Sequence, residues 1–212
     1  MNKLDDCIHC DHFSATIEAA HQRALRALNE ERAPLDTVIW LSAHLAAVDR
    51  VVLPAVRRHV PDTDAAIKEQ EKLSTEMQHA LRMLEQLLAG DALARRHDRA
   101  QLTEAVAALL STHASGEHKL LDALARAIGP EDAARLEERY ERAISDGPTR
   151  PHPHSAHEGI TGRAQFFFNR ARDHVMDVLD ARHVPIPRRR RPAPSNGKWG
   201  SYLLGTQHTP ER

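Results

Sequence analysis

The chain has 212 residues, 28% of them charged, and a formal net charge of −1, so it can bury a core but carries no overall charge favouring nucleic acid or a membrane surface. Aromatic residues make up only 4%, which favours helices over a sheet. No unbroken apolar run approaches the ~18–20 residues of a membrane span, and residues 1–6 lack the apolar stretch of a signal peptide. We therefore expect a cytoplasmic protein with no membrane partner and no specific nucleic-acid partner.

Four long amphipathic helices are predicted in the first part of the chain. They span about residues 12–31, 35–59, 62–89 and 98–128. We expect Pro54 to kink the second helix, Asp62 to cap the start of the third and Gly90 to end it. The predicted apolar face of the third helix contains Ala66, Leu73, Met77, Leu81, Leu84 and Leu88, with Gln70 among them. Long helices with short connections predict an all-α fold, an antiparallel up-down four-helix bundle over residues 12–129.

The remaining residues are expected to flank this bundle. Residues 1–11 would form an N-terminal arm that carries Cys7 and Cys10. Residues 130–184 would form a C-terminal helical extension, with helices over about 130–145 and 160–182 and a solvated His/Pro loop between them. We expect the last helix to dock on the bundle or on a second subunit, which would make a homodimer. Residues 185–212, with arginines among prolines, are expected to be a disordered basic tail.

Four ionisable side chains fall on faces that should be apolar. His113 and Glu117 are four residues apart, and therefore one turn apart, in the middle of the leucine-rich stripe of the fourth helix. His44 lies between Leu41 and Leu45 on the second helix, and His21 lies on the apolar face of the first. A buried carboxylate without a partner is costly, so something must neutralise Glu117.

A metal ion held between the helices is the expected partner of these groups. Imidazole suits iron, zinc and copper, and a carboxylate balances the charge of a divalent ion. His21, His44, His113 and Glu117 would be the ligands, with Asp49 and His118, at the edges of the apolar arcs, as outer or alternate ligands. The other interpretation is that the histidines are core residues that hydrogen-bond to Gln70, Glu117 and the backbone.

The spacing of these residues resembles the hemerythrin-like (HHE cation-binding) family over roughly residues 12–128. The resemblance rests on His21, on the string from His44 to Pro54, and on His113-Ala114-Ser115-Gly116-Glu117-His118. It implies a four-helix bundle that holds two bridged non-haem irons and binds dioxygen or nitric oxide, decomposes peroxide, or senses iron and oxygen. The chain departs from the family where Val48 replaces the bridging glutamate and where the third helix has Gln70 and Ser74 in place of histidines.

These departures leave three states of the site open: a single metal ion, a repurposed pocket with haem held by His44 or His113, or a site without metal. The leading functional hypothesis is a non-haem iron protein that handles or senses oxygen, peroxide or nitric oxide, with zinc as another possible metal. The alternative is a metal-free or haem-binding bundle that acts as a regulatory or interaction module. In that case Cys7 and Cys10, a Cys-x-x-Cys pair, would be redox-sensitive, although the same pair could supply half a zinc site.

Overall fold

The structure, a computed structural model, describes residues 8–29, 34–91, 98–152 and 173. All regular secondary structure in these ranges is helical, which confirms the predicted all-α class. The elements are α1 (Ile8–Asn29), α2 (Pro34–Ala47), the π-helical turn η2 (Val48–Val52), α3 (Leu53–His59), α4 (Asp64–Leu88), α5 (Arg99–Ala127) and α6 (Pro130–Ser145). The predicted helix ends therefore lie within a few residues of the observed ones, except that α1 begins inside the predicted arm.

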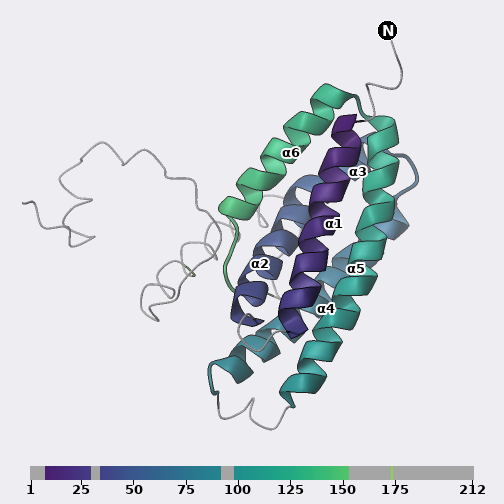
Figure 1. Cartoon of the computed structure of the whole chain (residues 1–212). Coiled ribbons are helices and arrows are strands. Elements are labelled where there is room, and N and C mark those ends of the chain that lie inside the picture. The colour runs from purple at the N-terminus through teal and green to yellow at the C-terminus, as the bar shows by residue number, and fades with distance from the viewer. Residues whose placement is uncertain (1–7, 30–33, 92–97, 153–172, 174–212) are drawn as a thin grey trace, which may run out of the picture.

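α1, the continuous segment of α2, η2 and α3, and then α4 and α5 lie side by side, and each runs opposite to the one before it (Figure 1). α1 packs against α2, α5 and α6, while α4 packs against α5 and α2. α6 lies along the outside of α1 and α2 (Figure 1). The segment made of α2, η2 and α3 is consequently covered on several sides, and it is the most completely buried part of the described chain.

Two apolar clusters fill the space between the helices. One gathers residues of α1, η2, α3, α5 and α6, including Phe13, Val52 and Leu124. The other lies toward the opposite end and includes Leu41, Met77 and Leu110. The four ionisable residues named above lie on helices that contribute to these clusters, so the fold surrounds them with hydrocarbon.

The second helical segment carries the predicted irregularity at Pro54. Proline has no N–H to donate, and its ring clashes with the carbonyl four residues earlier in a regular helix. The chain widens one turn before it into η2, where the Leu53 N–H donates to the carbonyl of Val48, five residues back. The predicted kink is therefore present as a π-helical turn.

Leu35–His59, the segment that includes this turn, is the one described helical stretch that is long and apolar enough to cross a membrane by length and composition. Of its most apolar window, 67% is buried inside the protein. A core helix of this kind needs the same composition, because it must bury its whole circumference.

Two predictions for the third helix were wrong in detail. Asp62 does not cap it: the helix begins at Asp64 after Thr63, and Asp62 has a left-handed φ of 57° in the turn. The buried face is also rotated, because Ala66 is exposed while Ile67 is buried. Its buried members are Ile67, Gln70, Ser74, Met77, Gln78, Leu81 and Leu84. Gln70, Met77, Leu81 and Leu84 are buried as predicted, whereas Ile67 and Gln78 were not predicted members of this face.

The C-terminal extension is described only in part. α6 matches the predicted helix over 130–145, and it buries Ala133, Leu136, Tyr140 and Ala143. His152, expected in a solvated loop, is instead partly buried, and its Nε2 lies 3.0 Å from both oxygens of the buried Asp173 carboxylate. Apart from Asp173, the predicted helix over 160–182 lies outside the described residues, as do Cys7, the homodimer contact assigned to that helix, and the basic tail.

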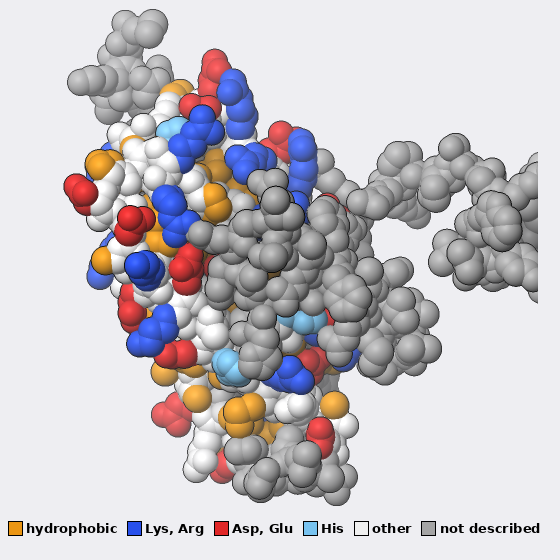
Figure 2. All heavy atoms as spheres, turned by 180° about the vertical axis from the view of Figure 1, so that it is seen from behind, with side chains coloured by type: hydrophobic (Ala, Val, Ile, Leu, Met, Phe, Trp, Pro, Cys, Tyr) orange, Lys and Arg blue, Asp and Glu red, His pale blue; other side chains and the backbone are white. Residues whose placement is uncertain are grey.

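The described surface is polar. Figure 2 shows charged side chains of both signs over the back of the molecule, with hydrophobic side chains in small separate spots. Among the described residues Leu35 is the only large hydrophobic side chain in the exposed class. Such scattered apolar atoms are normal for a protein surface.

Candidate metal centre

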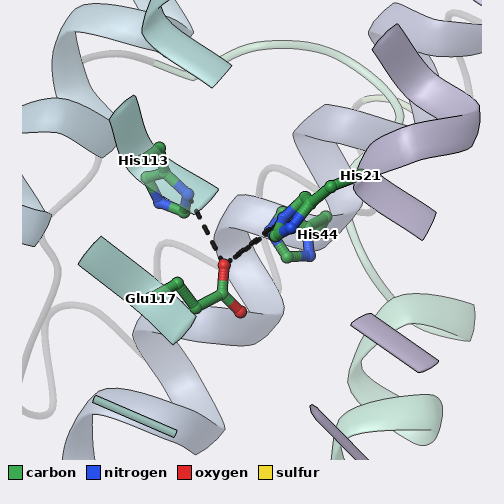
Figure 3. A group of neighbouring side chains, drawn as sticks. All are labelled: His21, His44, His113 and Glu117. Atoms are coloured by element: carbon green, nitrogen blue, oxygen red, sulfur yellow. Dashed lines mark hydrogen bonds and ion pairs between the residues drawn. The ribbon is translucent and has the colours of Figure 1, made fainter. Parts of the chain in front are cut away.

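The four predicted side chains converge in the interior. His21 comes from α1, His44 from α2, and His113 and Glu117 from successive turns of α5 (Figure 3). His44, His113 and Glu117 are fully buried and His21 is 4% exposed. One ligand atom from each residue lies within 4.8 Å of the other three. The prediction that these residues face inward together is confirmed.

Glu117 lies at the centre of the group. Its Oε2 is 3.2 Å from His44 Nε2, 3.4 Å from His21 Nε2 and 3.5 Å from His113 Nδ1. The Nε2 atoms of His21 and His44 are 3.0 Å apart. Atoms bound at 2.0–2.1 Å around a tetrahedral ion are about 3.3 Å from one another. The donor set, and the distances of Glu117 Oε2 from the three imidazole nitrogens, therefore fit a metal ion.

Two atoms of the group are poorly satisfied without such an ion. His113 Nδ1 and Glu117 Oε1 are buried and have no hydrogen-bond partner among the residues that the structure describes. A buried polar atom that forms no hydrogen bond costs roughly 1–3 kcal/mol. Coordination of His113 Nδ1 would remove one of these two penalties.

The electrostatics also suit a cation. Burial lowers the pKa of His113 to about 3, against the opposing attraction of Glu117, and it lowers the pKa of His44 in the same way. Burial alone would raise the pKa of Glu117, but attraction to His44 and hydrogen bonds from His21 and His44 hold it below its usual value. His44 and His113 thus offer neutral imidazole nitrogens beside the Glu117 carboxylate, the protonation states that metal ligands need.

His44 is held from two sides by aromatic side chains. Its Nδ1 lies 2.6 Å from the Tyr140 hydroxyl, which α6 supplies. The Trp40 ring stacks on the imidazole, with ring centres 4.9 Å apart and planes within 12°. Burial and the nearby Glu117 carboxylate raise the pKa of Tyr140 well above its usual value. Both contacts leave His44 Nε2 facing Glu117.

His113 is held by polar groups on α4. Its Nε2 lies 3.2 Å from the Ser74 hydroxyl, and that hydroxyl donates to Asp49 Oδ1 at 3.5 Å. The Gln70 amide donates to the His113 carbonyl at 3.0 Å. A Cβ at Gly116 would lie 2.5 Å from Gln70 Oε1, so a larger residue there would require the Gln70 amide to shift.

The structure also places Asp49 and His118, the two residues that the sequence suggested as outer or alternate ligands. Asp49, in η2, is half-buried and reaches His113 only through Ser74, which places it outside the converging four. His118 is exposed on α5, where it pairs with Asp122 at 3.5 Å and lies 3.2 Å from the Ser14 hydroxyl. Neither residue belongs to the group of four side chains that converge in the core.

A surface cavity of about 210 Å³ lies between α1 and α5, and His21 is the one member of the four that lines it. The exposed residues around it include Glu18, Gln22, Ser115 and His118. The cavity therefore reaches the group only at its edge, at His21, while the other three side chains remain fully buried.

Sequence reasoning missed Tyr140 and Trp40, which both contact His44. Tyr140 occupies the apolar face of α6 at helical spacing from Ala133 and Leu136, but no local pattern shows against which helix that face packs. Trp40 is four residues before His44, so their shared face was a usable signal.

Comparisons of the chain with models of protein families, with curated proteins and with solved structures found no match. The geometry of the four converging side chains is therefore the basis for assigning a function.

Proposed function

We propose that this chain is a hemerythrin-like metal-binding protein in which His21, His44, His113 and Glu117 hold one metal ion, with non-haem iron as the metal. The observation that carries the proposal is the convergence of three imidazoles and one carboxylate within 4.8 Å in a fully enclosed core. Inward-facing ligands from facing helices, here three of them, are the way in which helical bundles build metal sites.

The helix arrangement supports the hemerythrin-like part of the proposal. α1, the α2–α3 segment, α4 and α5 run in alternating directions, and we interpret them as the four helices of an up-down bundle (Figure 1). The ligands lie on the first, second and fourth of these helices, as the resemblance implies. We also propose that the protein acts in the cytoplasm.

The ligand count favours one ion over the two of the family. Among the described residues, these four are the one group of three or more His, Cys, Asp or Glu side chains close enough to hold a metal. Val48 lies in the apolar core, and Ser74 takes the α4 position that faces His113. A second ion would lack both a bridging acid and a histidine from α4.

Haem fits this interior less well than a single ion. The cavity beside His21, at about 210 Å³, is smaller than the roughly 300–1,000 Å³ of most cofactor pockets. The rings of His44 and His113 are 5.8 Å apart, and Trp40 already covers one face of His44. A porphyrin would have to displace this packing.

The small volume of the cavity beside His21, about 210 Å³, favours a small substrate. A bound iron would supply an open coordination position and a change of oxidation state for dioxygen, peroxide or nitric oxide. The residues of this chain would hold the ion and exclude bulk water, and the cavity between α1 and α5 reaches the group at His21. We propose that the protein handles or senses one of these molecules.

Elemental analysis and an absorption spectrum of protein produced with iron available test this function. We expect about one metal ion per chain, retained in His79→Ala, which alters an exposed histidine of α4, and lost in His113→Ala. About two irons per chain would contradict the single-ion site, and a strong haem band would contradict non-haem iron. A chain that takes up no metal would leave the interaction-module alternative.

A further inference from the structure

Tyr140 joins α6 to the candidate metal centre although it is no ligand itself. Its side chain is 6% exposed, and its hydroxyl lies 2.6 Å from His44 Nδ1, the ring nitrogen that points away from Glu117. Its ring packs edge-on against Phe13, with centres 5.4 Å apart. The phenol is therefore fixed by apolar packing while its oxygen touches the imidazole.

The docking of α6 determines where this oxygen lies. α6 packs on α1, α2 and η2, and Gly147, two residues after its end, sits so close to α2 that an added Cβ would come within 2.9 Å of Ala43 Cβ. Ala43 directly precedes His44 in α2. The close approach thus holds the extension against the same turn of α2 that presents the ligand.

An imidazole that binds a metal through Nε2 keeps its proton on Nδ1, and that N–H needs an acceptor. Among the described residues, the Tyr140 oxygen is the hydrogen-bonding atom placed on His44 Nδ1. Trp40, stacked on the ring face, restricts the tilt of the imidazole but offers no acceptor for this proton.

We propose that Tyr140 is a positioning residue of the metal site. Its hydroxyl oxygen accepts a hydrogen bond from the Nδ1–H of His44 and so holds His44 Nε2 toward the ion. The inference rests on the proposed function, and it makes the C-terminal extension part of the site. Outer hydrogen-bond partners of this kind typically contribute 10–100-fold to metal affinity.

Metal affinity, measured by chelator competition with Zn²⁺ and Fe²⁺ on the full chain, tests the proposal. Tyr140→Phe removes the oxygen and keeps the ring against Phe13, so we expect the dissociation constant to rise roughly 10–100-fold. Leu136→Ala is the matched control, because Leu136 is buried on the same face of α6 and belongs to the same apolar cluster. It should lower the melting temperature and leave the dissociation constant of the folded protein within about twofold.

A second measurement does not depend on a variant that folds. In the Zn²⁺-loaded wild type, long-range ¹H–¹⁵N spectra should show His44 protonated at Nδ1 and bound through Nε2. An unprotonated Nδ1, or a Tyr140→Phe affinity equal to that of wild type, would overturn the role of Tyr140 alone. A wild type that binds neither metal would instead overturn the proposed function, so the two failures are distinguishable.

Discussion

Glu117 is the residue on which the metal hypothesis can be tested with the smallest change. Glu117→Gln keeps the shape of a side chain that is completely buried and removes its negative charge. A metal at 100 times its dissociation constant stabilises the folded state by about 2.7 kcal/mol, a rise of roughly 5–10 °C in melting temperature for a chain of this size. We expect wild type to show this rise and Glu117→Gln to lose it, in thermal scans with and without metal. An equal rise in both proteins would show that Glu117 is not a ligand.

The lowered pKa of His113 predicts how the stability of the metal-free protein depends on pH. Its pKa is about 3 in the folded state and near 6.5 when unfolded, so below pH 6.5 the unfolded chain binds a proton that the folded chain does not. Stability should therefore fall as the pH decreases from 6.5, by up to about 1.4 kcal/mol per pH unit from this residue. The lowered pKa of His44 acts in the same direction.

Urea unfolding in the presence of a chelator, at pH 7, 6 and 5, measures this dependence. The free energy of unfolding should decrease at each step, and His113→Gln should show a smaller decrease because it lacks the titrating ring. A wild-type free energy that stays constant from pH 6.5 to pH 5 would mean that the folded and unfolded chains bind protons equally over this range, which would contradict the lowered pKa of His113.

At the scale of the helices, the sequence could predict α5 almost completely. The leucine stripe is a local signal that predicted a helix over about residues 98–128, and the observed helix is Arg99–Ala127. The structure adds the cap at its start, where the Asp98 side chain accepts a hydrogen bond from the Ala100 N–H. His113 and Glu117 could be found because they interrupt an otherwise apolar face of this helix. The same reasoning was partly wrong for α4: Gln70, Met77, Leu81 and Leu84 are buried as predicted, but Ala66 is exposed, and Ile67 and Gln78 are buried without having been predicted.

The parts that could not be predicted are those set by contacts between elements. Pro54 signals an irregular helix, but nothing local shows that the widened turn would be η2 or that Asp49 would reach Ser74 from it. In the same way, the periodicity of α6 predicts a buried face without naming its neighbours. The contact between Tyr140 and His44 spans 96 positions of the chain, and only tertiary packing creates it.

At the scale of the whole molecule, the structure ties α6 to the helices before it more closely than the predicted boundary at residue 129 suggests. Leu136, Tyr140 and Ala143 belong to the same apolar cluster as Phe13 and Val52. Removing α6 would expose that cluster to water, and burying one large apolar side chain contributes roughly 1.5–3 kcal/mol. The packed helices over residues 12–129 should therefore be less stable without α6, because part of their apolar cluster would be exposed.

Two shortened chains, residues 1–129 and 1–152, separate the contribution of α6 from that of the segment after it. We expect 1–152 to keep metal binding, since it retains Tyr140, although it loses the bonds from Thr149, Arg150 and His152 to Asp173. The 1–129 chain should melt at a lower temperature and bind metal more weakly by at least the 10–100-fold that loss of an outer partner costs. Melting temperatures and chelator competition on both chains measure these differences. If 1–129 matched the full chain in both, α6 would be an appendage, and the metal site would be complete within the four helices that precede it.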